Sequence, residues 1–475
     1  MIRKVFILLL IITGIKASSQ DTILDAYIKQ ALESNIALKE KQSSYEKSIL
    51  ALKEAKGMFY PNVSLNARYT VAAGGRTIDF PVGDMLNPVY STLNALNQLN
   101  GMVNTATGQP VYFLDPETGD PLTFPSLENE SFPFLRPQEH ETKIRVVQPI
   151  LNTDLYYNKK IKSNLAEVEK YGMNAYKRQL IYEVKSAYYI YCQSIEVLNL
   201  INETDILVKE NLRVSNALYN NNMVTIDNVY KSEAEQGKLE QKRAEAIKNN
   251  KMAKAYFNFL LNRELNKEIS VEPNLSDILP AIIKLEEAVK NSLENRDELK
   301  QLENYQTVNR NVTKMNKSNA IPDFTAVIDY GFQGEEYKFT GDYDYVMASL
   351  VLQWDLFKGF QNKRKIEQAR IDENMIANKM VETEKKINMQ VMQTYYSLEE
   401  AAKNIQAIDR EAEATEKAFH IIDKKYKEGQ SPLIEYLDSR NDYTSARQKV
   451  IIAKYDYLKK KAEYEWAACT NSIEP

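Results

Sequence analysis

The longest feature in the hydrophobic pattern runs from Phe360 to Glu428, a stretch that contains no glycine or proline. Apolar residues recur in it at three- and four-residue steps, the spacing of one face of an α-helix. They include Ile376, Met380, Ile387, Val391, Leu398, Ala402, Ile405, Phe419 and Tyr426. At about 1.5 Å per residue this helix would be roughly 100 Å long. A second such run, 152–219, contains one glycine, Gly172, and no proline.

Both ends of the long helix carry clear signals. An alternating run, 345–354, leads into it, which is typical of a β-strand. At the other end, Gly429 is suited to a left-handed C-terminal cap and Pro432 prevents the helix from continuing. The pattern therefore predicts a strand, a very long helix, a sharp turn and another helix from Leu433.

The chain is a tandem repeat. Leu32, Pro61 and Tyr69 correspond to Leu293, Pro322 and Tyr330, each 261 positions later. Further along, the offset is 207: Val184, Tyr188, Tyr219 and Asn228 correspond to Val391, Tyr395, Tyr426 and Glu435. The difference of 54 residues indicates an insertion in the first copy after Tyr69.

Each copy reads as helix, strand, strand, long helix, helix. The first helix is expected over 22–58, and strands about 62–76 and 142–149 in the first copy and about 323–338 and 343–354 in the second. Along the first strand, Val63, Leu65 and Tyr69 alternate with polar residues, as in a half-solvated strand. The two shorter helices of each copy together match the long one in length, so we expect them to stack end to end beside it.

These patterns divide the chain into five parts, all expectations from sequence. They are a signal peptide over 1–19, a first structural repeat over 20–261, a linker at mid-height over 262–285, a second repeat over 286–469, and a tail over 470–475. The signal reading depends on Arg3 and Lys4, the apolar run 5–12 and the small residues at 17–19. The insertion, about 74–141, holds eight of the fifteen prolines, and we expect a long non-helical loop with at most one helical turn at 91–99.

Composition excludes several functions. The 61 basic and 65 acidic residues nearly balance, so the chain lacks the excess of positive charge that is typical of nucleic-acid-binding proteins. Two cysteines and two histidines cannot make a disulfide framework or a clustered metal site, and we expect His140 in a loop. No nucleophile triad, paired-carboxylate cleft or phosphate loop is recognisable. We therefore expect no enzyme, no cofactor and no metal.

The strands imply oligomerisation. After the signal, no apolar run approaches the roughly 18 residues of a spanning helix, so membrane insertion would require strands. Four strands per chain leave open edges, which lipid does not tolerate. Two copies would supply eight strands and three would supply twelve, and the pattern alone leaves both open.

The sequence resembles the TolC-like outer-membrane efflux proteins over nearly the whole mature chain. The matching features are the duplicated helix that ends at proline, the strand-to-helix joints at 148–151 and 354–359, and the turn 426–429 followed by 433–438. Gly359-Phe360 stands where the family usually has paired glycines, and the first-copy loop is longer than usual. The resemblance implies a mainly α fold with a small β part: a homotrimer whose twelve-stranded outer-membrane barrel continues into a periplasmic α-helical tunnel.

The resemblance also implies a function. The chain would be the passive exit duct of a tripartite efflux or type I secretion system, working with a periplasmic adaptor and an inner-membrane pump. The alternative is a secreted or surface-attached coiled-coil structural protein or adhesin without a pore. The duplicated two-faced strands favour the duct, because a fibre needs no such faces. Cargo and pump class stay open.

The candidate site is the constriction at the two helix–helix turns. Glu435 and Asp438 lie one turn apart on the last helix, and in a trimer each would form a ring of three carboxylates that favours cations. By resemblance these positions carry the acidic rings of the periplasmic entrance, and Tyr426 helps to hold it shut. Asn228 replaces the first-copy acidic residue, with Asp227 beside it, and Ser431 replaces the family's gating arginine. Equally, Glu435, Asp438 and Asp227 could be solvated acids favoured by helix N-termini.

Overall fold

The computed structural model describes residues 22–98, 103–111, 114–273 and 284–470, which form two compact units. The first contains residues up to 57, 154–319 and 357 onward and is helical; the second, 58–153 and 320–356, contains the sheet. The predicted signal peptide and most of the predicted tail, with part of the linker, lie outside the described residues. Of the described helices, none has the length and apolarity required to cross a membrane.

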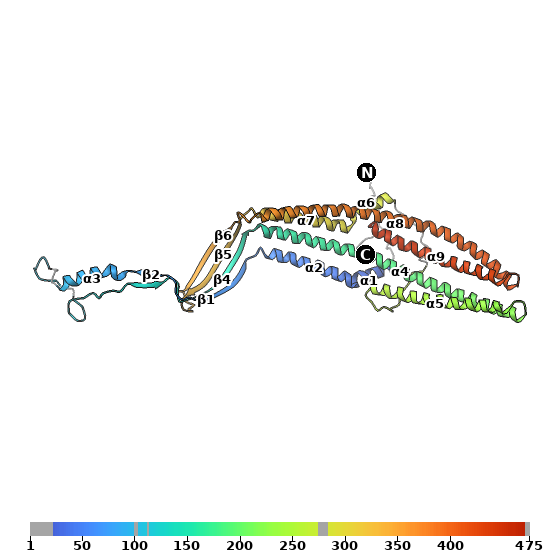
Figure 1. Ribbon diagram of the computed structural model, residues 1–475, viewed down its shortest axis with the longest axis horizontal. Coiled ribbons are helices and arrows are strands. Elements are labelled where there is room, and N and C mark those ends of the chain that lie inside the picture. Colours follow the sequence, from blue (N-terminus) through green and yellow to red (C-terminus); the bar gives the residue numbers. More distant parts are fainter. Residues whose placement is uncertain (1–21, 99–102, 112–113, 274–283, 471–475) are drawn as a thin grey trace, which may run out of the picture. The chain divides into compact units, whose positions relative to one another are not determined.

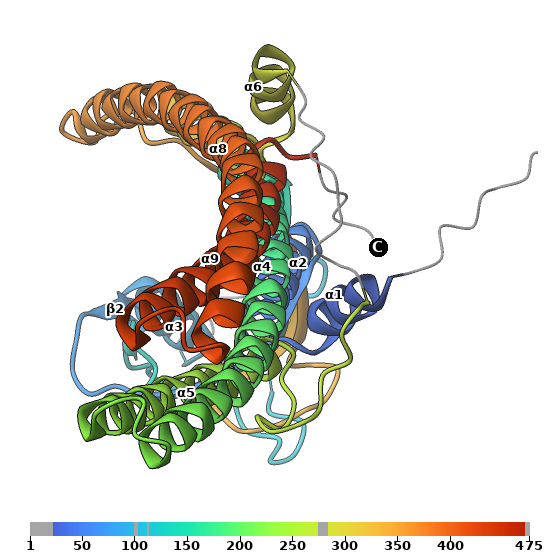
Figure 2. The same cartoon turned by 90° about the vertical axis from the view of Figure 1, so that its right-hand side faces the viewer.

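The helical unit is built on two very long helices, α4 (Thr153–Asn220) and α8 (Gln361–Lys427). Each turns back into a shorter helix beside it, α5 (Ile226–Leu260) after α4 and α9 (Leu433–Ala467) after α8 (Figure 1). Ser194 and Ser215 of α4 contact Asn250 and Ser232 of α5, as expected for antiparallel helices. Figure 2 shows the two hairpins from the end at which the helices turn back.

The helices that precede the strands are broken, in contrast to the single helix predicted over 22–58. α1 (Ile23–Ser34) and α2 (Ile36–Gly57) meet at Asn35, and α6 (Leu285–Asn295) and α7 (Asp297–Ser318) meet at Arg296, 261 positions later. The Asn35 side chain donates to the Leu260 carbonyl at the end of α5, 2.9 Å away, and accepts from the Leu38 amide. The break therefore coincides with a tertiary contact, which joins the junction of α1 and α2 to the end of α5.

The duplication is also visible in backbone conformation. Asn222 and Gly429, 207 positions apart, have positive φ angles of 56° and 74° at the two helix–helix turns. Asn262 and Cys469, again 207 apart, do the same after α5 and α9. Each is followed by an amide that bonds back to a carbonyl of the last helical turn, as in a Schellman cap. The repeat therefore preserves the cap geometry where one copy has glycine and also where neither does.

One hydrophobic core fills the middle of the helical unit. Tyr188 and Val184 of α4, Phe257 of α5, Leu398 of α8 and Tyr455 of α9 are all buried there. A second, smaller cluster lies at the two turns. Beside the first cluster, the ion pair of Lys185 with Glu465, 2.8 Å, ties α4 to α9. The two repeats thus pack against each other along their helices.

The second unit contains a four-stranded antiparallel sheet to which both repeats contribute, in the order β1-β4-β5-β6. The strands are β1 (Asn62–Val71), β4 (Gln138–Leu151), β5 (Asp323–Gly334) and β6 (Asp344–Gln353). β1 and β6 are its edges. His140, expected in a loop, is instead a fully buried residue of β4 whose ring stacks on Tyr337.

The insertion is structured, and the expectation of a non-helical loop was wrong. It contains a ribbon of β2 (Thr77–Phe80) and β3 (Glu130–Pro133) and the helix α3 (Val82–Gln98), in spite of Pro88. The side-chain amide of Asn87 on α3 donates to the backbone carbonyl of Leu127 and accepts from its backbone amide. Asn94 makes the same two hydrogen bonds with Phe124, and all four distances are 2.8 Å. The extended segment 122–129 therefore forms its backbone hydrogen bonds with these side chains, as it would with a neighbouring strand. Sequence periodicity does not reveal such pairing.

Candidate functional site at the helix turns

The two turns bring four helix ends together in one small core. Tyr426 near the end of α8 is buried and stacks on Tyr436 of α9, with ring centroids 4.7 Å apart. Phe419 and Tyr443 form a second stack at 4.9 Å. Leu207, Val214 and Leu218 of α4 pack against this cluster. The ends of the two hairpins therefore pack against each other.

A chain of hydroxyl groups crosses this core. The Ser232 hydroxyl donates to the backbone carbonyl of Asn228, 3.0 Å away. Because a hydroxyl has one proton, Ser215 must donate to Ser232 over 2.8 Å, and the Tyr426 hydroxyl must donate to Ser215 over 3.0 Å. The chain thus connects α8 of the second repeat through α4 to α5 of the first.

A buried ion pair forms the second link between the hairpins. Arg440 of α9, only 3% exposed, donates from Nη2 to Oε2 of Glu235 on α5 at 2.6 Å. Burial works to raise the pKa of the Glu235 carboxyl, but hydrogen bonds from Lys238 and Arg440 outweigh it, and the net pKa is lowered. Glu235 is therefore held ionised against the guanidinium.

The structure places the five predicted residues in different settings. Tyr426 is the first donor of the hydroxyl chain, and the backbone carbonyl of Asn228 is its last acceptor. Asp227 is exposed and paired with Thr225 and with Lys231, 3.0 Å away, and these hydrogen bonds lower its pKa. Tyr426 and Asn228 thus belong to the core of the turns, while Asp227 stays at its surface.

The two acidic residues of α9 lie on its exposed side. Glu435 accepts from the Ser431 hydroxyl at 2.6 Å. The side chain of Asp438 has no hydrogen bond or ion pair to any residue that the structure describes. Their neighbours Tyr436 and Leu437 face the core instead. Both carboxylates are therefore available to solvent or to another chain.

Sequence reasoning missed Ser215, Ser232, Glu235 and Arg440. A signal was present for the serines, because both occupy apolar positions of their helices. Ser215 continues the buried stripe of Leu200, Val208 and Asn211, and Ser232 lies in heptad register with Leu239 and Ala246. Nothing in sequence pairs Arg440 with Glu235. The resemblance points to an arginine at position 431, whereas the arginine of this core is Arg440.

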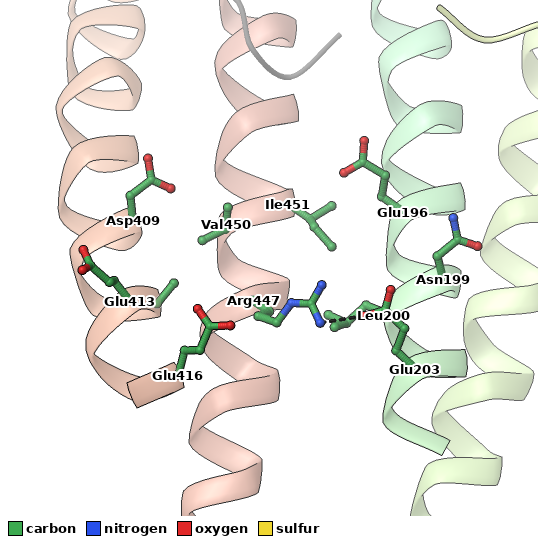
Figure 3. Close-up of a pocket in the computed structure, with 11 residues that line it drawn as sticks. Glu196, Asn199, Leu200, Glu203, Asp409, Glu413, Glu416, Arg447, Val450 and Ile451 are labelled. Carbon is green, nitrogen blue, oxygen red and sulfur yellow. Dashed lines mark hydrogen bonds and ion pairs between the residues drawn. The ribbon is translucent and has the colours of Figure 1, made fainter. Parts of the chain in front are cut away.

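A groove farther up the helices is a second candidate feature. It lies between α4, α8 and α9 and has a volume of about 500 Å³ (Figure 3). Five carboxylates line it against a single guanidinium, that of Arg447, which donates to Glu203 at 2.6 Å. The acidic residues are Glu196, Glu203, Asp409, Glu413 and Glu416. No group of three or more His, Cys, Asp or Glu in the described part of the chain is placed to hold a metal ion.

Comparison with known proteins agrees with this architecture. Residues 288–463, within the second repeat, match the family model described as outer membrane efflux protein. No curated protein sequence matches the chain. Among solved structures, the outer-membrane channel OprN superposes with a TM-score of 0.73 at 12% identity, over 95% of this chain and 91% of its own.

Two further channels have the same fold. The Campylobacter jejuni CmeC outer membrane channel has a TM-score of 0.73 at 13% identity, covering 94% of this chain and 86% of its own. The Neisseria gonorrhoeae MtrE outer membrane channel, solved in an open state, has a TM-score of 0.69 at 13% identity, covering 94% and 88%. Proteins of the matched family are conduits rather than enzymes. The chain therefore resembles the outer membrane efflux proteins, in sequence over its second repeat and in fold over nearly its whole length, as the duplicated pattern predicts.

Proposed function

We propose that this protein is the outer-membrane exit duct of a multi-component efflux or secretion system. It would be a passive conduit from periplasm to exterior, with the sheet in the membrane and the helices in the periplasm. Three copies would close a twelve-stranded barrel. The family match over residues 288–463 and the channel fold support this assignment.

The observation that carries the proposal is the apolar face of the sheet. Directly opposed residues in the strand register share a face, and one face is mostly apolar and largely exposed in the single chain; its polar members are Gln138, His140, Thr142, Gln148 and Asp344. Its exposed apolar members are Val63, Leu65, Tyr69, Val71, Ile144, Ile328, Tyr330, Val346, Leu350 and Leu352. A patch of this kind across four strands is typical of a lipid-facing wall. A coiled-coil adhesin without a pore has no use for such a wall.

The free edges of the sheet also support the proposal. The outer edges of β1 and β6 have no partner strand among the described residues. Unpaired backbone groups are not tolerated in hydrocarbon, so a membrane-embedded sheet of four strands requires neighbours at both edges. Identical copies provide them, with β6 of one copy beside β1 of the next.

The core at the helix turns would act as the gate. The hydroxyl chain and the Arg440–Glu235 pair hold the two hairpins of one copy together. Opening of a tunnel mouth requires the hairpins to separate, so these links favour the closed state. Glu435 and Asp438 would then face the axis as carboxylate rings.

A periplasmic adaptor would dock on the helices, and the acidic groove is suited to it. Five carboxylates against one guanidinium favour a basic helical surface on the partner. The adaptor would then lie between α4, α8 and α9 of one copy.

Assembly in the outer membrane tests the proposal. Membranes from cells that produce the protein are fractionated, and the purified protein is cross-linked and run unboiled on a gel. We expect it in the outer-membrane fraction, as a detergent-requiring trimer that dissociates on heating. Recovery as a water-soluble monomer would overturn the proposal. Co-purification with an adaptor separately tests the assignment to a multi-component system.

A further inference from the structure

The polar face of the sheet carries a layer of charged side chains. Arg68 of β1 lies opposite Glu141 of β4, and Arg145 of β4 lies opposite Asp329 of β5. Lys143 lies between Glu141 and Arg145 on the same face. Tyr345 of β6 completes the layer, because its hydroxyl donates to Glu141 at 2.8 Å. All four strands therefore contribute.

The carboxylates lie beneath the cations. Asp329 is 0% exposed and receives a bidentate pair of hydrogen bonds from Arg145, at 2.8 and 2.7 Å, with the Lys143 ammonium 3.6 Å away. Glu141 is 18% exposed and pairs with Lys143 at 2.6 Å and with Arg68 at 3.6 Å. Both negative charges are thus covered by basic side chains.

The cations that reach solvent are guanidinium groups. The side chain of Arg68 is 65% exposed and that of Arg145 is 38% exposed. Gly331 lies opposite Lys143, and a Cβ added to it would lie 2.5 Å from the Lys143 Cβ. The close packing of the layer therefore depends on a glycine at this position. Beyond the layer, Glu139 accepts from Gln333 at 2.7 Å and lies 3.8 Å from Arg136. Within the layer itself three cations face two anions.

We propose that this layer is a basic, anion-attracting section of the conduit, separate from the acidic residues at the helix turns. The inference rests on the proposed function, in which the polar face lines the lumen. Closure of the sheet would arrange the Arg68 and Arg145 groups of all copies around the water-filled path. Charges of one sign inside a low-dielectric wall concentrate the opposite ion, so the layer raises the local concentration of anionic permeants.

The test is ion selectivity in planar bilayers. The reversal potential of the purified protein in a potassium chloride gradient gives the potassium-to-chloride permeability ratio. Arg68→Gln removes an exposed charge without leaving buried Asp329 unpaired, and Arg68→Glu reverses it. The matched control is Arg364→Gln, since Arg364 is 70% exposed in the first turn of α8, outside the sheet.

We expect Arg68→Gln to raise the potassium-to-chloride ratio by about twofold, and Arg68→Glu to raise it further, with the control unchanged. Conducting variants with an unaltered ratio would overturn the proposal. The proposal also fails if the substitutions change only the heat stability of the assembly, because the layer then serves strand register alone. Absence of conductance in the unsubstituted protein would instead contradict the proposed function, and the proposed role of the layer would then fail as well.

Discussion

Arg440 and Glu235 form a buried ion pair, 2.6 Å from Nη2 to Oε2, that joins the last helix of the second repeat to the last helix of the first. Both residues lie near the helix turns, and Arg440 occupies a position of the buried stripe of α9 that begins with Leu433, Tyr436 and Leu437. The pair is an interaction between hairpins, so its loss affects their separation more than the folding of either hairpin. This distinguishes it from the many i,i+4 pairs on the helix surfaces.

Arg440→Gln should loosen the turns. Breaking a buried pair leaves Glu235 without its partner on α9 and costs about 3 kcal/mol. We expect a lower unfolding temperature in detergent and a higher open probability in bilayers. Arg447→Gln is the control, because its pair with Glu203 is 40% and 56% exposed and should contribute about 1 kcal/mol or less. Equal effects of the two substitutions would contradict a special role for Arg440.

Acid should weaken the same link. The pKa of Glu235 is lowered in the folded protein, so its stabilising pairing is complete above the ordinary value of 4.5 and is lost as the pH falls through the lowered value. We expect open probability to rise as the pH falls below 4.5, the ordinary value, through the lowered pKa of Glu235. Glu235→Gln should remove this component of the pH dependence. A pH response of the same size in that variant would assign it to other groups.

Tyr426→Phe should break the hydroxyl chain while keeping the ring stack on Tyr436. The loss of one buried hydrogen bond costs about 1 kcal/mol, with more if the Ser215 oxygen finds no other donor. Ser232→Ala should have a similar effect, and the double variant should lose less than the sum of the two, because both act on one chain. Tyr230→Phe is the control, since Tyr230 of α5 is 62% exposed. Thermal unfolding in detergent measures all four; strict additivity would argue against the chain.

Removing the exposed carboxylates of α9 should change selectivity rather than stability. Glu435→Ala with Asp438→Ala removes two charges per copy at the proposed mouth, so we expect weaker cation preference and weaker block by divalent cations. Single-channel recordings in potassium chloride, with and without added divalent salt, provide the readout. Unchanged preference and block would favour the simpler interpretation that both residues are solvated acids at a helix N-terminus.

Sequence alone anticipates much of the helices and of the sheet, because their signals are local. Pro61 and Pro322 follow the ends of α2 and α7, and the alternation of Leu65 and Tyr69 with polar neighbours indicates a two-faced strand. Gly429 indicates the turn, where it has a φ of 74°. Each of these depends on the residue's own backbone preference or on periodicity.

The rest depends on contacts between distant residues. The helix break at Asn35 requires the Leu260 carbonyl, and the insertion helix α3 requires Asn87 and Asn94 to find the segment 122–129. The hydroxyl chain likewise depends on serines that look like ordinary small residues in a helix. Pairings between distant residues, such as that of Arg440 with Glu235, leave no mark on periodicity. The candidate gate could therefore be located by its turns, although its chemistry could not be predicted.

Conductance of the purified full chain in a planar lipid bilayer, with the copy number determined by cross-linking in the same detergent, tests the proposed conduit most directly. We expect a three-copy assembly that inserts and produces discrete current steps. A chain that stays monomeric in water and leaves the bilayer silent would contradict the conduit function.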